Sequence, residues 1–116
     1  NEASLIMAAG ILLEWDIDAV LVRGDGADFL RQFPLFIDFL HLDGSEPETT
    51  FEQFQYAEPK LSLSAVVCID DCHSYGDWEW GKGNKVIPYL QEKGGWSVVV
   101  QPSAFQYKTA ICRKIS

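Results

Sequence analysis

Two apolar runs of strand length each end in aspartate, and this pattern limits the folds that the chain can adopt. One run covers residues 35–43 (LFIDFLHLD) and the other covers residues 65–71 (AVVCIDD). The second run has almost no polar alternation before its acids, as expected for a strand covered on both faces. In an open α/β sheet, ligands bind at the carboxyl ends of the parallel strands. The pattern therefore predicts that Asp43, Asp70 and Asp71 converge on one site.

Length, composition and charge narrow the class of protein. The 116 residues, 47% of them hydrophobic, predict a single domain over residues 1–116 with a real core. The net charge of -8 opposes phosphate backbones and anionic membranes, and the lysines and arginines form no basic patch. No apolar run reaches the roughly 18 residues of a membrane helix, and a signal-peptide pattern is absent. We therefore expect a soluble, cytoplasmic protein with a small-molecule partner, and neither nucleic acid nor a membrane.

Helix and strand patterns alternate along the chain. Helices are predicted over residues 2–14, 27–32, 48–57 and 84–93, with Asn84 as the cap of the last. Strands are predicted over residues 19–23, 35–42, 65–70, 96–101 and 107–113. The last two strands are joined by a connection too short for a parallel crossover, so they should form an antiparallel hairpin. The fold class is α/β, with a mostly parallel sheet that ends in this hairpin.

This order resembles the C-terminal two-thirds of class I S-adenosylmethionine-dependent methyltransferases. VLVRGDGADFL looks like their third strand and the adenine-side turn, FIDFLHLDGS like the fourth strand, and AVVCIDD like the fifth. WSVVVQP and KTAICRK are similar to the closing hairpin. The similarity is greatest to metal-dependent O-methyltransferases acting on catechols or antibiotic sugars, whose fourth and fifth strands end in comparable acids. The resemblance implies a partial Rossmann-like sheet and in-line methyl transfer to an oxygen of a hydroxylated small molecule.

The same resemblance implies roles for individual residues. The three aspartates would hold Mg²⁺ or a similar divalent cation. Asp43 and His73 form the predicted catalytic group, in which His73, from its position after the acidic pair and not from the resemblance, is a general base or a substrate contact. Asp25 and Gly26 would contact the adenine end of S-adenosylmethionine. Two plainer interpretations stay open, because Asp25 also suits a simple turn and loop histidines such as His73 are usually solvated.

The chemistry of the three aspartates supports a metal site independently of the family resemblance. A hard divalent cation takes carboxylate oxygens and water, and could hold two vicinal hydroxyls while lowering the pKa of the one to be methylated. The alternative is that strand-end aspartates only cap helices and receive loop amides. Because clustered acids are electrostatically unfavourable without a cation, we favour the metal site.

Other residues near these acids leave alternatives open. Among the three cysteines, Cys68 and Cys112 lie in strand-like runs and should be buried, as in a reducing compartment. Cys72 could be exposed, although a nucleophilic role would need a positioned base. His41 is either a core imidazole or a site residue. Tyr75, Trp78 and Trp80 form an aromatic loop, either a substrate wall, which we favour, or a lid over the core.

The chain also departs from the family pattern. The family's opening strand and glycine-rich turn are not found in these residues, and no G-x-G-x-G occurs. Gly24-Asp25-Gly26 is a lone turn, and Gly81-Lys82-Gly83 lacks the preceding strand of a phosphate loop. We expect either a truncated piece of a longer reading frame or a remnant without its cofactor half. The second function hypothesis is accordingly a non-catalytic α/β binding or interaction domain that keeps an acidic cation or sugar pocket.

The missing strands leave an edge of the predicted sheet open. In the complete family sheet, two further strands separate the strand at residues 19–23 from the strand at residues 35–42. An apolar edge with unpaired amides is a template for pairing, so it should not stay open. Either residues 19–23 cross over to pair with residues 35–42, or two chains join there as a homodimer, which we favour.

Overall fold

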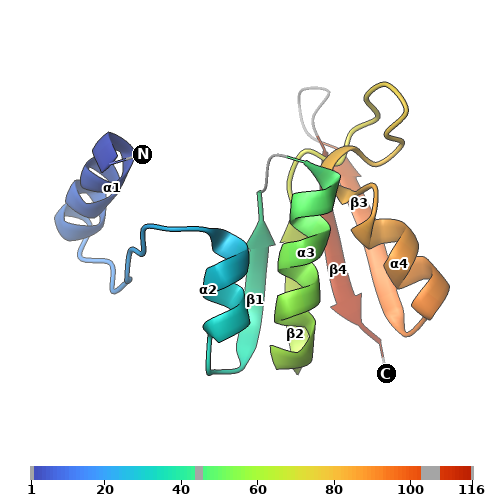
Figure 1. Cartoon of the computed structure of the whole chain (residues 1–116), viewed down its shortest axis with the longest axis horizontal. Helices are drawn as coiled ribbons and strands as arrows, with labels where there is room; N and C mark the ends of the chain where they lie inside the picture. Colours follow the sequence, from blue (N-terminus) through green and yellow to red (C-terminus); the bar gives the residue numbers. More distant parts are fainter. Residues whose placement is uncertain (1, 44–45, 103–107, 116) are drawn as a thin grey trace.

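The computed structural model describes residues 2–43, 46–102 and 108–115. A four-stranded sheet with strand order β1-β2-β4-β3 forms the main body of the structure, and helices from the middle and C-terminal parts of the chain pack against it (Figure 1). In chain order the elements are α1 (Glu2–Glu14), α2 (Gly26–Gln32), β1 (Ile37–Leu42), α3 (Pro47–Ala57), the 3-10 turn η1 (Glu58–Lys60), β2 (Leu61–Ile69), the 3-10 turn η2 (Gly81–Gly83), α4 (Val86–Lys93), β3 (Trp96–Pro102) and β4 (Lys108–Lys114). The helices and the strands from residue 35 onward thus form close to their predicted positions; residue 107 lies outside the described residues.

The sheet is mixed, which corrects the prediction of a mostly parallel one. β1 and β2 are parallel, with Leu42 opposite Ile69. β4 runs antiparallel to both β2 and β3, so the predicted hairpin is confirmed. Strands β1, β2 and β3 share a direction, but the short connection returns β4 between β2 and β3. Each neighbour of β4 is therefore antiparallel to it.

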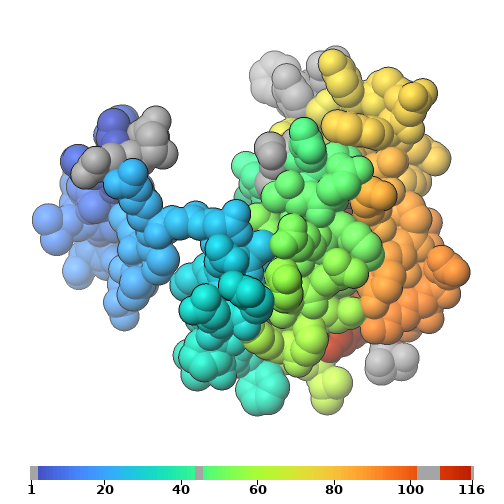
Figure 2. All heavy atoms as spheres, viewed as in Figure 1, coloured from blue at the N-terminus to red at the C-terminus, as the bar shows by residue number. Residues whose placement is uncertain are grey.

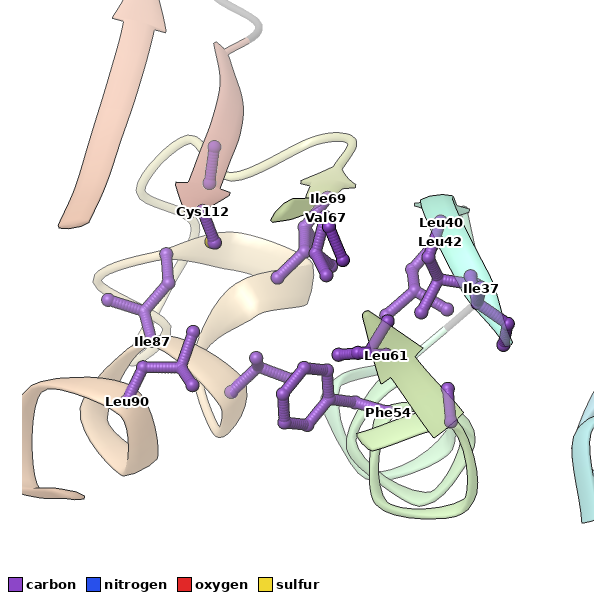
Figure 3. Close-up of a cluster of buried hydrophobic side chains, with 14 of the residues drawn as sticks. Ile37, Leu40, Leu42, Phe54, Leu61, Val67, Ile69, Ile87, Leu90 and Cys112 are labelled. Atoms are coloured by element: carbon purple, nitrogen blue, oxygen red, sulfur yellow. The ribbon is translucent and has the colours of Figure 1, made fainter. Parts of the chain in front are cut away.

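The core fills the space between one sheet face and helices α3 and α4 (Figure 3). Val67 of β2, Phe54 of α3 and Leu90 of α4 are fully buried there. The Phe54 ring meets Tyr89 and Trp96 edge-on, with centroid separations of 6.0 Å and 6.1 Å. This contact links α3 to both α4 and β3. The two helices therefore form a layer on one face of the sheet that holds the strands in place.

The opposite sheet face is less covered by the described residues. Val66 and Cys68 of β2 are only half-buried, and Phe39 of β1 is 63% exposed. The prediction that Cys68 is buried is therefore wrong, whereas Cys112 is fully buried as predicted. His41 is exposed on this side of β1 and is not a core imidazole. The side chains alternate along β1 and β2, so those next to the core residues point away from the helices.

The N-terminal segment lies apart from the sheet (Figures 1 and 2). Helix α1 ends at Glu14 and is followed by a turn that contains Asp16, whose φ is 52°. The Ile17 amide closes this turn by donating to the Leu12 carbonyl at 2.9 Å. The strand predicted over residues 19–23 does not form, so that prediction is wrong. A strand needs a neighbour for its backbone hydrogen bonds, and among the described strands β1 pairs with β2 alone. The crossover alternative is therefore also wrong.

Two further features concern the helices. Helix α4 begins at Val86 with Lys85 in the cap position, so the prediction that Asn84 caps it is wrong. The Asn84 Oδ1 atom instead accepts a hydrogen bond from the Trp80 amide at 3.3 Å and closes the preceding turn. Within the described part of the chain, no helix is both long and apolar enough to cross a membrane.

Candidate functional site

The ends of β1 and β2 bring the predicted acids together. Leu42 and Ile69 are register partners, and the Asp70 amide donates to the Leu42 carbonyl at 3.1 Å. Asp43 and Asp70 follow these two residues, so both leave the sheet at the same edge. Carboxylate oxygens of Asp43, Asp70 and Asp71 all lie within 4.8 Å of one another. The predicted convergence of the three acids is confirmed.

The backbone at Asp71 turns sharply and directs the chain away from β2. Its φ is 51°, in the left-handed region that non-glycine residues rarely adopt, although aspartate tolerates it better than most. Such a conformation persists only where the surroundings hold it. Here the Asp71 carbonyl accepts a hydrogen bond from the Lys82 amide at 3.0 Å. The neighbouring Asp70 Oδ1 accepts one from the Thr109 hydroxyl at 3.3 Å.

Lys82 is the site residue that the sequence analysis missed. Its ammonium lies 2.7 Å from Asp43 Oδ1 and 3.1 Å from Asp71 Oδ2, and its side chain is only 21% exposed. Burial alone would lower the pKa of Lys82, but the hydrogen bonds to Asp43 and Asp71 raise it above its ordinary value. Lys82 therefore stays protonated at neutral pH and is not a general base in this arrangement.

Gly81 and Gly83, on either side of Lys82, are the sequence feature that could have indicated its position beside the acids. A Cβ atom on Gly81, whose φ is 52°, would lie 2.2 Å from the Asp71 carbonyl oxygen and 2.6 Å from that of His73. A Cβ atom on Gly83 would lie 2.9 Å from Cys72 Sγ. The η2 turn therefore packs directly against the end of β2. Both glycines permit this close approach, which carries Lys82 over the acids.

A small pocket adjoins the acids. It has a volume of about 140 Å³ and is lined by Asp71, His73, Tyr75, Trp78, Gly81 and Lys82. Reciprocal backbone hydrogen bonds of 2.8 Å and 2.9 Å close the turn between Tyr75 and Trp78. Trp80 instead packs against the hydrophobic core. The aromatic loop thus supplies one tryptophan to the pocket wall and one to the core cover.

Cys72 is buried, so the exposure that its place beside the acids allowed does not occur. The turn at Asp71 sends the thiol inward, where its Sγ atom donates to the Ile69 carbonyl at 3.3 Å. Burial raises the pKa of Cys72 from 9.0 to about 11. A buried thiol that stays protonated at neutral pH is not a nucleophile.

Asp25 and Gly26 lie at a different pocket. Asp25 is the N-cap of α2, and its carboxylate accepts a hydrogen bond from the Asp28 amide at 3.0 Å. Both residues line an open hollow of about 540 Å³ with Val20, Arg23 and Phe29. The capping hydrogen bond occupies only one carboxylate oxygen of Asp25. Helix capping and ligand binding by Asp25 are therefore compatible.

Solved structures of methyltransferases share this architecture. An rRNA methylase from Streptococcus thermophilus matches with a TM-score of 0.72 and 15% identity, over 100% of this chain and 70% of that chain. A Streptococcus mutans protein in complex with S-adenosylhomocysteine matches with a TM-score of 0.70 and 17% identity, over 98% of this chain and 72% of that one.

An O-methyltransferase of tomaymycin synthesis from Streptomyces achromogenes, in complex with S-adenosylmethionine, matches with a TM-score of 0.68 and 16% identity, over 100% of this chain and 59% of that chain. No protein-family model and no curated protein matches the sequence. The sequence identities of 15%, 17% and 16% are low, so the likeness concerns the fold. The chain has the fold of a large part of an S-adenosylmethionine-dependent methyltransferase.

Proposed function

We propose that the chain forms the substrate side of a methyltransferase that uses S-adenosylmethionine and a divalent cation to methylate a hydroxyl oxygen of a small molecule. The observation that carries this proposal is the meeting of Asp43, Asp70 and Asp71 at adjacent strand ends, within 4.8 Å of one another. The pocket lined by His73, Tyr75 and Trp78 adjoins that cluster and would receive the substrate.

The donor set suits a hard cation. Carboxylate oxygens are the ligands that Mg²⁺ and Ca²⁺ prefer, and three of them leave coordination positions for water or substrate oxygens. When bound, such a cation lowers the pKa of a coordinated hydroxyl. His73 would accept the proton of that hydroxyl, because it lines the pocket beside Asp71. Trp78 would flank an aromatic or sugar ring and exclude water.

The methyl donor would enter from the α2 side. The matched structures from S. mutans and S. achromogenes contain S-adenosylhomocysteine and S-adenosylmethionine, respectively. Asp25 and Gly26 line the hollow at the start of α2, and we assign them to the adenine end of the cofactor. A small-molecule substrate fits the net charge of -8 better than RNA, the substrate class of the matched rRNA methylase.

A non-catalytic role is the second candidate function. The 116 residues contain no G-x-G-x-G turn, the feature that commonly holds a nucleotide cofactor in such sheets. In that role the acids would bind a cation or a sugar without methyl transfer. Cation binding and cofactor binding therefore have to be measured separately.

The metal proposal predicts a thermal shift. Mg²⁺ at about ten times its dissociation constant should stabilise the folded chain by about 1.4 kcal/mol and raise its melting temperature by several degrees. Asp70→Asn should abolish the rise, because it removes a ligand. Asp38→Asn is the matched control, since Asp38 is exposed on β1 outside the cluster. Equal increases in the melting temperature of the parent chain, Asp70→Asn and Asp38→Asn would indicate general screening of negative charge and contradict the metal site.

The cofactor proposal makes a separate prediction for these 116 residues alone. Without the amides of a glycine-rich turn, S-adenosylmethionine should bind more weakly than about 1 mM, corresponding to about 4 kcal/mol. Isothermal titration calorimetry on the chain measures this directly. A dissociation constant in the low micromolar range would show that residues described in this structure suffice to hold the cofactor.

A further inference from the structure

Lys82 places a cation where the proposed metal would bind. Its ammonium contacts Asp43 and Asp71 at 2.7 Å and 3.1 Å, and carboxylate oxygens of these two residues and Asp70 lie within 4.8 Å of one another. A divalent ion held by the same oxygens would lie within a few ångströms of this ammonium. Two positive charges at that distance repel strongly, so the ammonium and the metal exclude each other.

The backbone of η2 holds Lys82 in this place. The Lys82 amide donates to the Asp71 carbonyl at 3.0 Å, so the residue is anchored to the acid that its side chain contacts. Gly81 is pressed against the Asp71 and His73 carbonyls, and Gly83 against Cys72. The start of the side chain is therefore fixed, while its four-carbon stem can still rotate.

The surroundings offer the ammonium a second position. Lys82 lines the adjoining pocket together with Tyr75 and Trp78, whose rings can hold a cation through their π faces. An ammonium that left the acids would enter the pocket assigned above to the substrate. Metal binding and the charge of that pocket would then change together.

We propose that Lys82 is a tethered cation that neutralises Asp43 and Asp71 in the metal-free protein and is displaced into the adjoining pocket by a divalent metal ion. This inference rests on the proposed metal site and adds the residue that sets its affinity and selectivity. To displace the Lys82 ammonium, an ion must be attracted to the carboxylates more strongly than the ammonium is. A divalent ion meets this condition better than a monovalent ion because its charge is doubled. Lys82 would thus exclude Na⁺ and K⁺ and limit occupancy by Mg²⁺.

The test is calorimetric titration of Mg²⁺ into the folded chain and its variants. Lys82→Met should bind Mg²⁺ at least tenfold more tightly than the parent chain, because the competing charge is gone. Lys82→Arg should bind like the parent. Lys85→Met is the matched control, since Lys85 pairs with Glu48 at 3.9 Å outside the cluster, and should leave the affinity unchanged.

The outcomes separate this inference from the proposed function. Equal Mg²⁺ affinity in the parent chain and Lys82→Met would overturn the competition while leaving the metal site intact. No binding by either protein would overturn the metal site as well. If Lys82→Met is unfolded without metal, far-UV circular dichroism during Mg²⁺ titration decides, because refolding supports the proposal and a permanently unfolded chain contradicts it.

Discussion

Replacing Gly81 with alanine is expected to lower the free energy of unfolding by about 2–5 kcal/mol. The left-handed backbone at φ 52° contributes about 1–2 kcal/mol. The new Cβ atom would lie 2.2 Å from the Asp71 carbonyl oxygen, and relieving such overlap costs about 1–3 kcal/mol more. The neighbouring atoms are backbone, so they cannot rotate away as a side chain would.

Urea denaturation followed by circular dichroism measures this loss. Gly76→Ala is the matched control, because Gly76 has a similar φ of 56° but a Cβ atom added there would meet nothing within 4 Å. It should lose only the backbone contribution of about 1–2 kcal/mol. Equal losses in the two variants would show that η2 does not press on the end of β2, and the position of Lys82 would lose its support.

Charge on the open edge of β1 is expected to convert a dimer into monomers. We propose that two copies of the chain pair along β1, because its outer edge has no neighbour among the described strands. Leu35, Phe36 and Phe39 are all exposed at this edge, at 65%, 79% and 63%. Two copies related by a twofold axis would bury these side chains and pair the free amides in a continuous sheet.

Sedimentation velocity at high micromolar concentration distinguishes the two states. The parent chain should sediment as a dimer, and Phe39→Lys as a monomer, since lysine on an edge strand opposes pairing. Val99→Lys is the control, because Val99 is a partly exposed apolar residue on β3 at the opposite edge of the sheet. A parent chain that stays monomeric, with rapidly exchanging β1 amides, would rule out this interface.

The convergence of the acids could be predicted from the sequence because it depends only on which strands pair and in which direction they run. Once residues 35–42 and 65–70 form parallel neighbours, strand direction alone places Asp43 and Asp70 at one edge. Hydrophobic periodicity also predicted α3, α4 and the closing hairpin, whose connection is too short for any other arrangement. Phe54 falls on the apolar side of its helix for the same reason.

The wrong predictions concern residues whose secondary structure, burial or contacts depend on residues far away in the sequence. Residues 19–23 have strand-like composition, yet a strand forms only where another strand accepts its hydrogen bonds. Cys72 looked exposed because it follows two acids, but the left-handed turn at Asp71 reverses its direction. Lys82 was passed over because only the folding of η2 onto β2 brings it near Asp43.

By itself the sequence determined the α/β class, most element positions and the acidic edge, since these follow from local periodicity and strand direction. Only the tertiary structure decided that β4 enters between β2 and β3, that Cys72 is buried, and that Lys82 neutralises Asp43 and Asp71. The physical reason is that each of these features depends on close contacts between segments far apart in the chain. No local pattern encodes the 2.7 Å approach of Lys82 to Asp43 across 39 residues of sequence.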